Sequence, residues 1–338
     1  MNFFKTIIKR FWIVILLAVI INVPILVIGT YRTDKTITLK GDTTNIKSLV
    51  EVDNEYTEEG SFSSIYVISM DHSTILQNMI CDLSVTTDVD DLSDYYLHFT
   101  DSETYQMGQV QKNSSIQTSI ITAFNYAKSL NEKVYIDYKF KSLCVSFYFE
   151  GSPFKIKDEI IKINDIDVTA GRDEFVKQIL SSKENDLVTV LRDEQEINIK
   201  LSKNAYQLMR FYEYYDINYD TIFPKITVNK SSSGGPSGGL LQTLSILNRL
   251  TEMDYSKGLK ISGTGTMSVS FNVGAIGGIK QKIYTAYDDN VDIFFCPEKN
   301  YEEALIAYNN LKKKERMKLV SVKTLADAVS YLENVWKL

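Results

Sequence analysis

The hydrophobic pattern divides the chain into an apolar run near its start and a long body of mixed polarity. Between Phe11 and Gly29 the sequence has one polar side chain, Asn22, and no charged residue. A helix over this run, at a rise of 1.5 Å per residue, is about 28 Å long, close to the ~30 Å hydrocarbon core of a bilayer. The pattern predicts a membrane-spanning helix within residues 1–30.

The charges that flank this run predict its orientation. Lys5, Lys9 and Arg10 precede it, and Arg32 and Lys35 follow it. The positive-inside bias, with the short N-terminal flank weighed first, favours a cytoplasmic N-terminus and a body outside the cytoplasm. A cleaved signal peptide is the alternative, but the apolar run exceeds the ~7–15 residues usual in such segments.

Residues 31–133 are expected to form a mixed α/β scaffold, because they contain no cluster of groups that could carry chemistry. Thr100 and Glu103 have the spacing of a capping box, and apolar residues follow at helical intervals, so a long helix is predicted up to Leu130. The other expected elements are a strand at Ser61–Met70, a short helix at Thr74–Ile80 and a loop over the acidic run Asp88–Asp94.

Residues 134–202 change to strand-like alternation, which predicts a small module rich in β-structure around one helix. The expected elements are strands at Val134–Phe140, Cys144–Phe149, Leu187–Leu191 and Glu196–Leu201 and a helix at Asp173–Leu180.

A peptide-binding role for this module rests on one motif. The turn Gly151-Ser152-Pro153 and the stretch Lys157–Val168 resemble the signature of bacterial PDZ domains. Asp158 and Asp165 stand where that signature has glycine, which a turn tolerates, but the loop that would hold a peptide carboxylate is not recognisable. A strand-rich linker domain without a ligand therefore remains open.

Residues 203–338 alternate strands and helices, which predicts an α/β domain. The expected strands are Ile222–Val228, Leu259–Gly263, Val291–Phe295 and Leu319–Val322. Two helices are expected to start at Pro236 and at Gly278, and two more are expected at Tyr301–Leu311 and Leu325–Trp336.

The charge balance argues against nucleic-acid binding. The formal net charge is −6, and the three basic groups of the first thirty residues leave 34 basic and 43 acidic residues, or −9, in the remainder. Phosphate backbones repel a body of this charge, and no basic stretch with interleaved aromatic residues is present.

Histidine and cysteine are too sparse for a His-based triad or a common metal site. His72 and His98 are the only histidines, and the cysteines at 81, 144 and 296 show no CxxC spacing. The cysteines are expected to be buried apolar residues, with a disulfide between Cys81 and Cys144 left open if the body lies outside the cell. No metal or organic cofactor is implied.

The candidate nucleophile is Ser237, within the run SSSGGPSGG. Pro236 suits the first turn of a helix, which would place Ser237 among unsatisfied backbone N–H groups able to stabilise an oxyanion. Gly235 and Gly238 would let a substrate backbone approach closely. Taken alone, a serine among glycines is an ordinary helix start, and a phosphate loop is disfavoured because no Gly-Lys-Ser/Thr follows.

The candidate base is a lysine, because a serine hydroxyl is a poor nucleophile until a base takes its proton and the two histidines lie in unsupported contexts. Burial beside Ile279 and Ile283 would lower the pKa of Lys282 by penalising its charged form. Lys280 points about 200° away from Lys282 on a helix and is expected to be solvated.

Three motifs then carry a family resemblance: Gly-Pro-Ser-Gly-Gly, Gly-Thr-Gly-Thr and Val-Gly-x-Ile-Gly-Gly-Ile-Lys-Gln-Lys. In order and spacing they resemble the proteolytic domain of Lon-type serine proteases. The resemblance implies that Ser237 is the nucleophile, that Lys282 is the general base and that Thr264 supports the lysine. Ala275 replaces a proline common in that family, and Gly239 extends its Ser-Ala-Gly into Ser-Gly-Gly, without removing a chemical group.

With its apolar run and PDZ-like insert, the whole chain is similar to bacterial membrane-bound PDZ/Lon-like proteases, which lack the ATPase module of true Lon. No Walker-type loop occurs in the sequence. The expected domains are a cytoplasmic flank and transmembrane helix (1–30), a scaffold (31–133), a PDZ-like domain (134–202) and a Lon-like α/β proteolytic domain (203–338).

The expected function is ATP-independent serine endopeptidase activity on extracytoplasmic peptides or proteins, through an acyl-enzyme on Ser237. The expected partners are a peptide or protein substrate and the cell membrane, and self-association into a homo-oligomer remains open. The alternative is a catalytically silent PDZ/Lon-like protein that tethers a partner at the membrane, against which the presence of Ser237, Thr264 and Lys282 argues.

Overall fold

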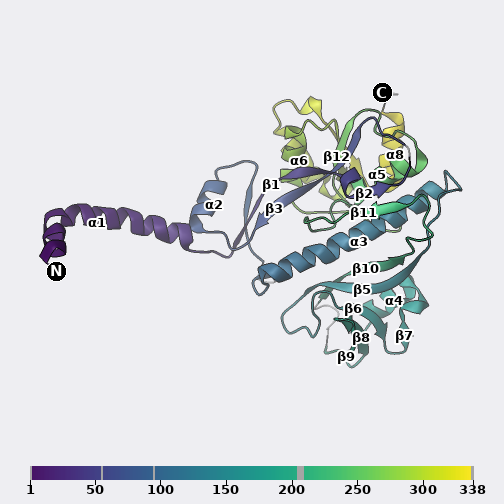
Figure 1. The fold of residues 1–338 in the computed structure, drawn as a ribbon, viewed down its shortest axis with the longest axis horizontal. Helices are drawn as coiled ribbons and strands as arrows, with labels where there is room; N and C mark the ends of the chain where they lie inside the picture. The colour runs from purple at the N-terminus through teal and green to yellow at the C-terminus, as the bar shows by residue number, and fades with distance from the viewer. Residues whose placement is uncertain (1, 55, 94–95, 204–208, 336–338) are drawn as a thin grey trace. The chain divides into compact units, whose positions relative to one another are not determined.

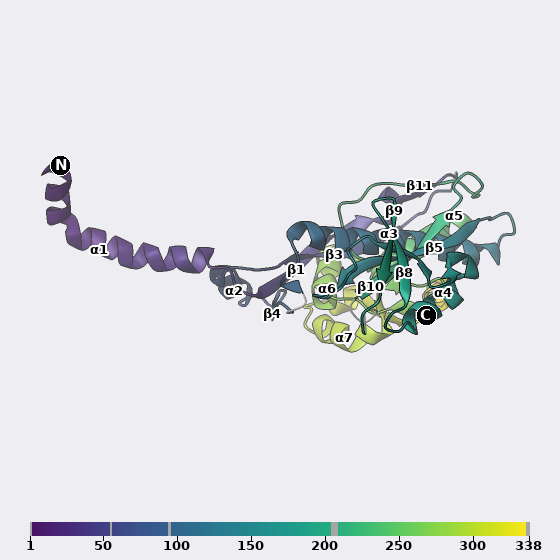
Figure 2. The ribbon, with the colours of Figure 1, turned by 90° about the horizontal axis from the view of Figure 1, so that it is seen from below.

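A computed structural model describes residues 2–54, 56–93, 96–203 and 209–335 (Figures 1 and 2). The chain forms two compact units. The first unit consists of Met1–Lys40 and Ile68–Leu97, and the second of Gly41–Val67 and His98–Leu338. Strands β1 (Lys35–Asn45) and β3 (Ser61–Met70) contribute residues to both units.

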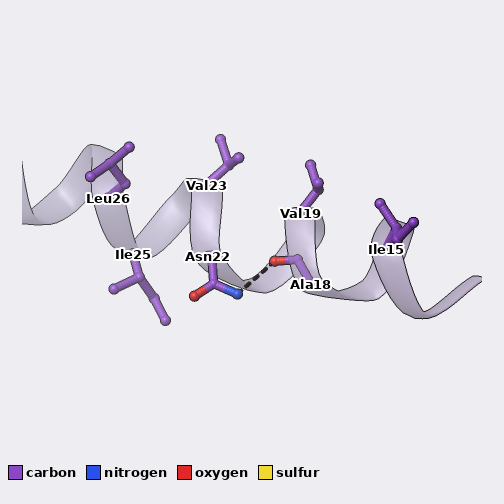
Figure 3. Close-up of a pocket in the computed structure, with 7 residues that line it drawn as sticks. All are labelled: Ile15, Ala18, Val19, Asn22, Val23, Ile25 and Leu26. Carbon is purple, nitrogen blue, oxygen red and sulfur yellow. Dashed lines mark hydrogen bonds between the residues drawn. The ribbon is translucent and has the colours of Figure 1, made fainter. Parts of the chain in front are cut away.

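The first unit begins with helix α1 (Asn2–Thr30), as the apolar run predicts. Its segment Arg10–Thr30 is long and apolar enough to cross a membrane. Asn22 donates from Nδ2 to the carbonyl of Ala18 at 2.7 Å, so its side chain is satisfied within the helix itself (Figure 3). The apolar helix is confirmed, and its place in a membrane stays a prediction.

The rest of the first unit contains helix α2 (Ile75–Cys81) and strand β4 (Asp88–Asp91). The short helix is confirmed, and Thr74 caps it in a capping box. The prediction of a loop over Asp88–Asp94 is wrong for its first four residues, because β4 pairs antiparallel with β1. Asp90 and Asp91 are exposed on an edge strand, and Lys35 pairs with Asp91 at 2.8 Å, so these carboxylates do not prevent strand formation.

The second unit contains a sheet whose strand order is β16-β15-β12-β3. Strands β12 (Lys260–Gly263), β15 (Ile293–Pro297) and β16 (Lys318–Val322) confirm three predicted strands and run parallel to one another. β3 pairs in parallel with β12, with Phe62 opposite Ile261. A strand from the predicted scaffold region therefore extends the sheet of the C-terminal α/β region.

Four helices follow the predicted alternation in this part of the chain, and their apolar faces supply much of two buried clusters. They are α5 (Gly239–Thr251), α6 (Ile279–Asp288), α7 (Tyr301–Asn309) and α8 (Leu325–Asn334). Trp336, the predicted end of the last helix, lies outside the described residues.

Helix α3 (Asp101–Lys128) lies between α5 and a second sheet in Figure 1. Thr100 and Glu103 form the predicted capping box at its start. Ile120, Ala123 and Phe124 are fully buried in the same apolar cluster as Leu240 and Leu244 of α5.

The second sheet has the strand order β10-β5-β6-β8-β9, with β7 paired to β6, and helix α4 (Arg172–Leu180) packs into its apolar cluster. Its strands are β5 (Tyr138–Tyr148), β6 (Glu159–Ile163), β7 (Ile166–Asp167), β8 (Leu187–Arg192), β9 (Gln195–Lys200) and β10 (Met209–Ile217). The structure confirms the predicted helix and the last two predicted strands of this module.

Two sequence predictions in this region are wrong. The runs Val134–Phe140 and Cys144–Phe149 are not two strands, because the single strand β5 begins within the first run and continues through most of the second. The predicted strand Ile222–Val228 shrinks to β11 (Ile226–Val228), since Pro224 has no N–H to donate to a ladder. β10, which the sequence analysis did not identify, pairs antiparallel along β5.

The positions that depart from the PDZ signature have local explanations. Asp158 is buried and pairs with Arg192 at 2.6 Å. At the turn between β6 and β7 the left-handed residue is Asn164, with φ 49°, and not Asp165. The structure thus describes a small sheet with one helix, and its peptide-binding role stays a prediction.

The remaining elements are short. They are 3-10 turns at Ile46–Ser48, Val168–Ala170, Glu298–Asn300 and Lys314–Arg316, strand β2 (Val50–Val52) paired with β11, and the hairpin strands β13 (Thr266–Met267) and β14 (Val273–Gly274).

Candidate active site

Ser237 lies in a tight turn directly before helix α5. The helix begins at Gly239 with Gly238 as its N-cap, and the N–H of Gly239 donates to the carbonyl of Pro236 at 3.3 Å. The prediction that Pro236 occupies the first helical turn is therefore wrong, because its carbonyl closes the turn that precedes the helix. Ser237 itself is half-buried, which leaves its hydroxyl within reach of a bound substrate.

The backbone before Ser237 adopts a conformation that glycine favours. Gly235 has φ 86°, a left-handed conformation that residues with a Cβ adopt at a cost. Its N–H donates to the carbonyl of Gly108 at 2.9 Å. Among the described residues, the N–H groups of Ser237 and Gly238 donate no backbone hydrogen bond outside the regular elements. Two unsatisfied donors thus flank the hydroxyl, as a helix start provides.

Lys282 projects from the first turns of helix α6. The helix is capped by Gly278, with φ 67°, where an added Cβ would lie 2.9 Å from Val67 Cγ1. Lys282 is 2% exposed, and its neighbours Ile279 and Ile283 are fully buried. Lys280, predicted to be solvated, is in fact half-buried.

The structure brings Ser237, Lys282 and Thr264 into direct contact. Lys282 Nζ lies 2.8 Å from Ser237 Oγ and 3.0 Å from Thr264 Oγ1. Both are hydrogen-bond distances, and the first is short enough for direct proton transfer.

Thr264 fixes this geometry from the end of strand β12. Its side chain is fully buried, and its N–H donates to the carbonyl of Phe295 at 3.0 Å. Its hydroxyl donates to the carbonyl of Ser237 at 3.1 Å, which leaves the oxygen to accept from Lys282. The N–H of Gly265 also donates to the Ser237 carbonyl, at 2.8 Å. The nucleophile turn is therefore tied to the sheet.

Burial controls the charge of Lys282. Desolvation lowers the pKa of its amine from 10.5 to about 7, because taking an ammonium ion out of water is unfavourable. Within the described part of the chain no carboxylate forms an ion pair with Lys282 that would restore the charge. Near neutral pH a large fraction of the amine is neutral and can accept a proton.

Helix α3 holds the nucleophile turn from the other side, which the sequence analysis missed. Ser115 Oγ donates to the carbonyl of Pro236 at 3.1 Å, and Ser119 Oγ donates to the carbonyl of Gly239 at 3.0 Å. Gly108 faces Gly234 so closely that a Cβ on Gly108 would lie 3.2 Å from Gly234 Cα. The local sequence signal of this packing is a helical glycine, Gly108, with Ser115 seven residues later and Ser119 eleven residues later.

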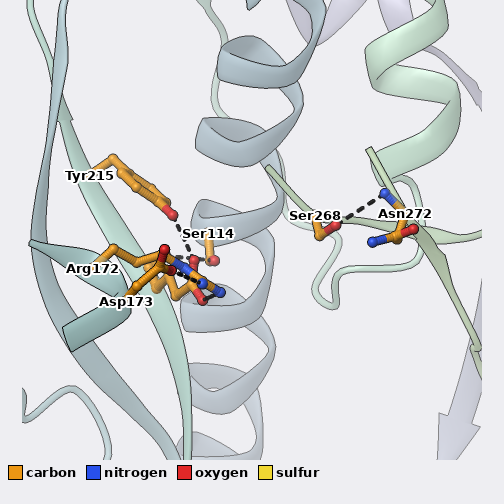
Figure 4. Close-up of polar contacts among 7 residues, drawn as sticks. Ser114, Arg172, Asp173, Tyr215, Ser268 and Asn272 are labelled. Atoms are coloured by element: carbon orange, nitrogen blue, oxygen red, sulfur yellow. Dashed lines mark hydrogen bonds and ion pairs between the residues drawn. The ribbon is translucent and has the colours of Figure 1, made fainter. Parts of the chain in front are cut away.

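The opposite face of α3 contacts the second sheet. Ser114 Oγ donates to the carbonyl of Glu213 on β10 at 2.8 Å. The Glu213 carboxylate accepts from Arg172 of α4 at 2.5 Å and from Tyr215 at 2.6 Å (Figure 4). Adjacent serines of one helix thus bond to the module on one side and to the nucleophile turn on the other.

The other candidate groups have different neighbours from those of Lys282. His72 lies 3.7 Å from Asp34, and the ring of His98 packs 4.1 Å from that of Phe99. Cys81 and Cys144 are free thiols, so the disulfide left open by the sequence does not form. Among the described residues no group of three His, Cys, Asp or Glu side chains could hold a metal ion.

Comparison with known proteins agrees with this geometry. The family model of the Lon protease (S16) C-terminal proteolytic domain matches residues 187–333, a range that contains Ser237, Thr264 and Lys282. The C-terminal part of the chain is therefore similar to the Lon-type proteolytic domain.

The chain is also similar to individual Lon proteases. The chain is 25% identical to the Lon protease of Campylobacter jejuni over 145 residues, which cover 43% of this chain and 17% of that protein. The Lon proteases of Elusimicrobium minutum and Mycoplasma pneumoniae are 30% and 34% identical, over 32% and 25% of this chain and 12% and 11% of their own lengths. The matched segment thus spans less than a fifth of each of these relatives.

Proposed function

We propose that this chain, whose residues 187–333 match the Lon-type proteolytic domain, is a serine endopeptidase that acts through a Ser237/Lys282 dyad. The observation that carries the proposal is the 2.8 Å separation of a buried amine of lowered pKa from a half-buried serine hydroxyl at a helix start. Serine with a neutral lysine base is a known solution for acyl transfer.

In the proposed reaction the neutral amine of Lys282 takes the proton of Ser237 as the oxygen attacks the substrate carbonyl carbon. The resulting ammonium gives that proton to the leaving amine when the peptide bond breaks, which leaves an ester on Ser237. Water, activated by the same lysine, then cleaves the ester and restores the hydroxyl. Thr264 orients the amine, because its oxygen accepts one N–H and leaves the lone pair directed at Ser237.

The negative charge that develops on the substrate carbonyl oxygen needs hydrogen-bond donors. The N–H groups of Ser237 and Gly238 are the proposed pair, since both precede the hydrogen-bonded part of α5. Loss of one such donor costs about 10²–10³ in rate in serine proteases. The glycines on either side place no Cβ in the path of the substrate.

The cellular setting is also part of the proposal. The apolar helix Arg10–Thr30 would anchor the chain, and the basic N-terminal flank would keep the N-terminus cytoplasmic and the protease outside. ATP independence is supported by a sequence without a Walker-type loop. The substrate class would be extracytoplasmic peptides or proteins, which the PDZ-like module would present or gate.

Peptide cleavage by the full chain tests the dyad, with mass spectrometry of the products from a mixture of unstructured peptides. Ser237→Ala and Lys282→Ala should each abolish cleavage and leave the circular dichroism spectrum unchanged. Lys280→Ala is the matched control, because it removes a lysine from the same helix turn and should retain activity. Retention of most activity by either dyad variant would reject the mechanism and favour the silent tethering role.

A further inference from the structure

Helix α2 and the turn that follows it carry a group of exposed apolar side chains in the first unit. Met79, Ile80, Leu83 and Val85 are 59%, 60%, 87% and 75% exposed. Together with Leu76, the first three have the spacing i, i+3, i+4, i+7, which places them on one side of a helix. We call Leu76, Met79, Ile80 and Leu83 the α2 apolar face. Single exposed apolar residues are ordinary on protein surfaces, but a group on one face indicates a surface that binds something.

The α2 apolar face begins against the end of helix α1. A Cβ added to Gly29 would lie 3.9 Å from Leu76 Cδ2, which is an ordinary van der Waals contact. The N–H of Ile75 donates to the carbonyl of Tyr31 at 3.3 Å, so the backbone of α2 is also bonded to the residue that follows α1. The α2 apolar face therefore continues the apolar surface of the segment Arg10–Thr30.

The opposite side of α2 is polar and is bonded to the chain that leaves α1. Asn78 follows Leu76 by two residues and so points about 200° away from it on the helix. Its Nδ2 donates to Thr33 Oγ1 at 2.9 Å, and its Oδ1 accepts from Ser73 Oγ. The N–H of Thr33 in turn donates to the carbonyl of Ser73 at 2.9 Å. These bonds fix the rotation of α2 and leave its apolar face uncovered.

The turn after α2 satisfies its backbone groups internally. The N–H groups of Asp82, Leu83 and Ser84 donate to carbonyls within α2 at 2.9, 3.4 and 3.0 Å. The hydroxyl of Thr87 donates to the carbonyl of Cys81. Backbone groups that enter lipid must have partners within the protein, and this turn meets that requirement for these groups.

The charges near the α2 apolar face determine which surface it suits. The segment from Ile75 to Asp91 contains four acidic residues and no basic residue, so anionic headgroups would not attract it. Asp82 is exposed and points about 100° away from Leu83, so its carboxylate can stay in water when Leu83 enters lipid. Tyr31 is 61% exposed at the end of α1, and tyrosine is enriched where a membrane meets water.

We propose that the α2 apolar face, with Val85, inserts into the surface of an electrically neutral lipid layer beside the end of α1. Amphipathic helices on lipid lie about 5–10 Å into the boundary between headgroups and acyl chains. This inference rests on the membrane anchor of the proposed function and adds a second point of contact with the bilayer. Two contacts would prevent the first unit from rotating freely about the axis of α1.

Depth-dependent fluorescence quenching tests the insertion on the full chain in phosphatidylcholine nanodiscs with one chain per disc. A nitrobenzoxadiazole dye would be attached to Leu83→Cys in a Cys81→Ser background. Cys144 and Cys296 are buried and therefore react slowly with the dye. The quenchers are lipids that carry a nitroxide either close to the headgroup or at the end of the acyl chain.

Two further labelled positions are the controls. Ile306→Cys places the dye on α7 of the second unit, at an apolar residue that is 67% exposed. Val19→Cys places it in the middle of the apolar segment of α1 and reports whether the anchor spans the bilayer.

The dye at Leu83→Cys should be quenched severalfold more strongly than the dye at Ile306→Cys, and more by the shallow nitroxide than by the deep one. The dye at Val19→Cys should be quenched more by the deep nitroxide. Adding Ile80→Asp should reduce the quenching at Leu83→Cys to the level of the Ile306 control, because a carboxylate opposes insertion of this face. Gln77→Asp, an equal charge on an exposed position outside the face, is the matched control and should leave the quenching unchanged.

The results that contradict the proposal differ from those that reject the anchor. Quenching at Leu83→Cys no stronger than at Ile306→Cys, while Val19→Cys is quenched by the deep nitroxide, would overturn the insertion and leave the anchor in place. Equal effects of Ile80→Asp and Gln77→Asp would also overturn it. A dye at Leu83→Cys that is shielded only when each disc holds two chains would assign the face to a second copy instead. An unquenched dye at Val19→Cys would reject the anchor, and the insertion with it.

Discussion

Replacement of Lys282 by methionine should abolish the proposed peptidase activity and make the protein more stable. Methionine fills a similar volume with no charge to desolvate. The amine has a pKa of about 7 in the folded chain and 10.5 as an unburied lysine. At pH 7 the folded group holds about half a proton and the unfolded group a whole one, and the lowered pKa destabilises the fold by about 4 kcal/mol.

The two hydrogen bonds that Lys282 donates to Ser237 and Thr264 offset part of this cost. Each is worth about 1 kcal/mol net, and the Thr264 hydroxyl keeps its bond to the carbonyl of Ser237 in the variant. The variant should thus be about 1–3 kcal/mol more stable at pH 7. The cost falls as pH rises towards 10.5, so at pH 9 it is only about 2 kcal/mol and the advantage of the variant should nearly vanish.

Differential scanning fluorimetry of the full chain in detergent at pH 7, 8 and 9 measures this difference. Ser237→Ala, inactive but still carrying the lysine, controls for self-digestion and should melt close to the wild type. A gain of 1–3 kcal/mol corresponds to several degrees in melting temperature at pH 7. Two results would refute the conclusion that the buried Lys282 amine has a lowered pKa. One is a methionine variant less stable than wild type at every pH, and the other is a stability difference that does not change between pH 7 and 9.

Three further predictions concern the same site. The rate constant kcat/KM should rise about tenfold from pH 6 to pH 8 as Lys282 loses its proton, given its pKa of about 7, and a flat profile would argue against a lysine base. Thr264→Val, which keeps the side-chain shape and removes the hydroxyl, should lower kcat by about 10–100-fold with little change in KM. Equal effects on kcat and KM would indicate a role in binding instead. Gly108→Val should destabilise the chain by about 1–3 kcal/mol and reduce activity, because it forces α3 away from Gly234. The control is Gly151→Ala, which has no neighbour within 4 Å and therefore tests backbone strain alone. Unimpaired activity of Gly108→Val would show that α3 does not position the nucleophile turn.

The sequence predicted the local elements of the candidate site well because short motifs determine them. The glycine-rich turn before α5, Thr264 after a buried strand and Lys282 on an amphipathic helix could each be identified from a few neighbouring residues. The catalytic roles of these residues remain predictions that the experiments above test.

Non-local pairing is what the sequence did not reveal. β3 joins the C-terminal sheet beside β12, about two hundred residues later in the chain, and β10 joins the sheet of the PDZ-like region. Hydrophobic alternation predicts that a strand exists but does not identify its partner. The contacts of Gly108 and Ser115 with the nucleophile turn are of the same kind, because they depend on the packing of α3 against α5.

Proline and charge patterns misled the analysis in two places for physical reasons. Pro236 fits the first turn of a helix, yet its carbonyl is needed to close the preceding turn and to accept from Ser115. The acidic run at Asp88 looked like a loop, yet an edge strand tolerates exposed carboxylates when Lys35 pairs with one of them.

The most direct test of the central claim is the site of acylation. The full chain would be mixed with a p-nitrophenyl ester of a blocked amino acid, quenched in acid during the first turnover, digested and analysed by mass spectrometry. We predict an acyl group on the peptide that contains Ser237, absent from Ser237→Ala and strongly reduced in Lys282→Ala. An acyl group on another residue, or one at Ser237 that forms equally fast without Lys282, would contradict the account.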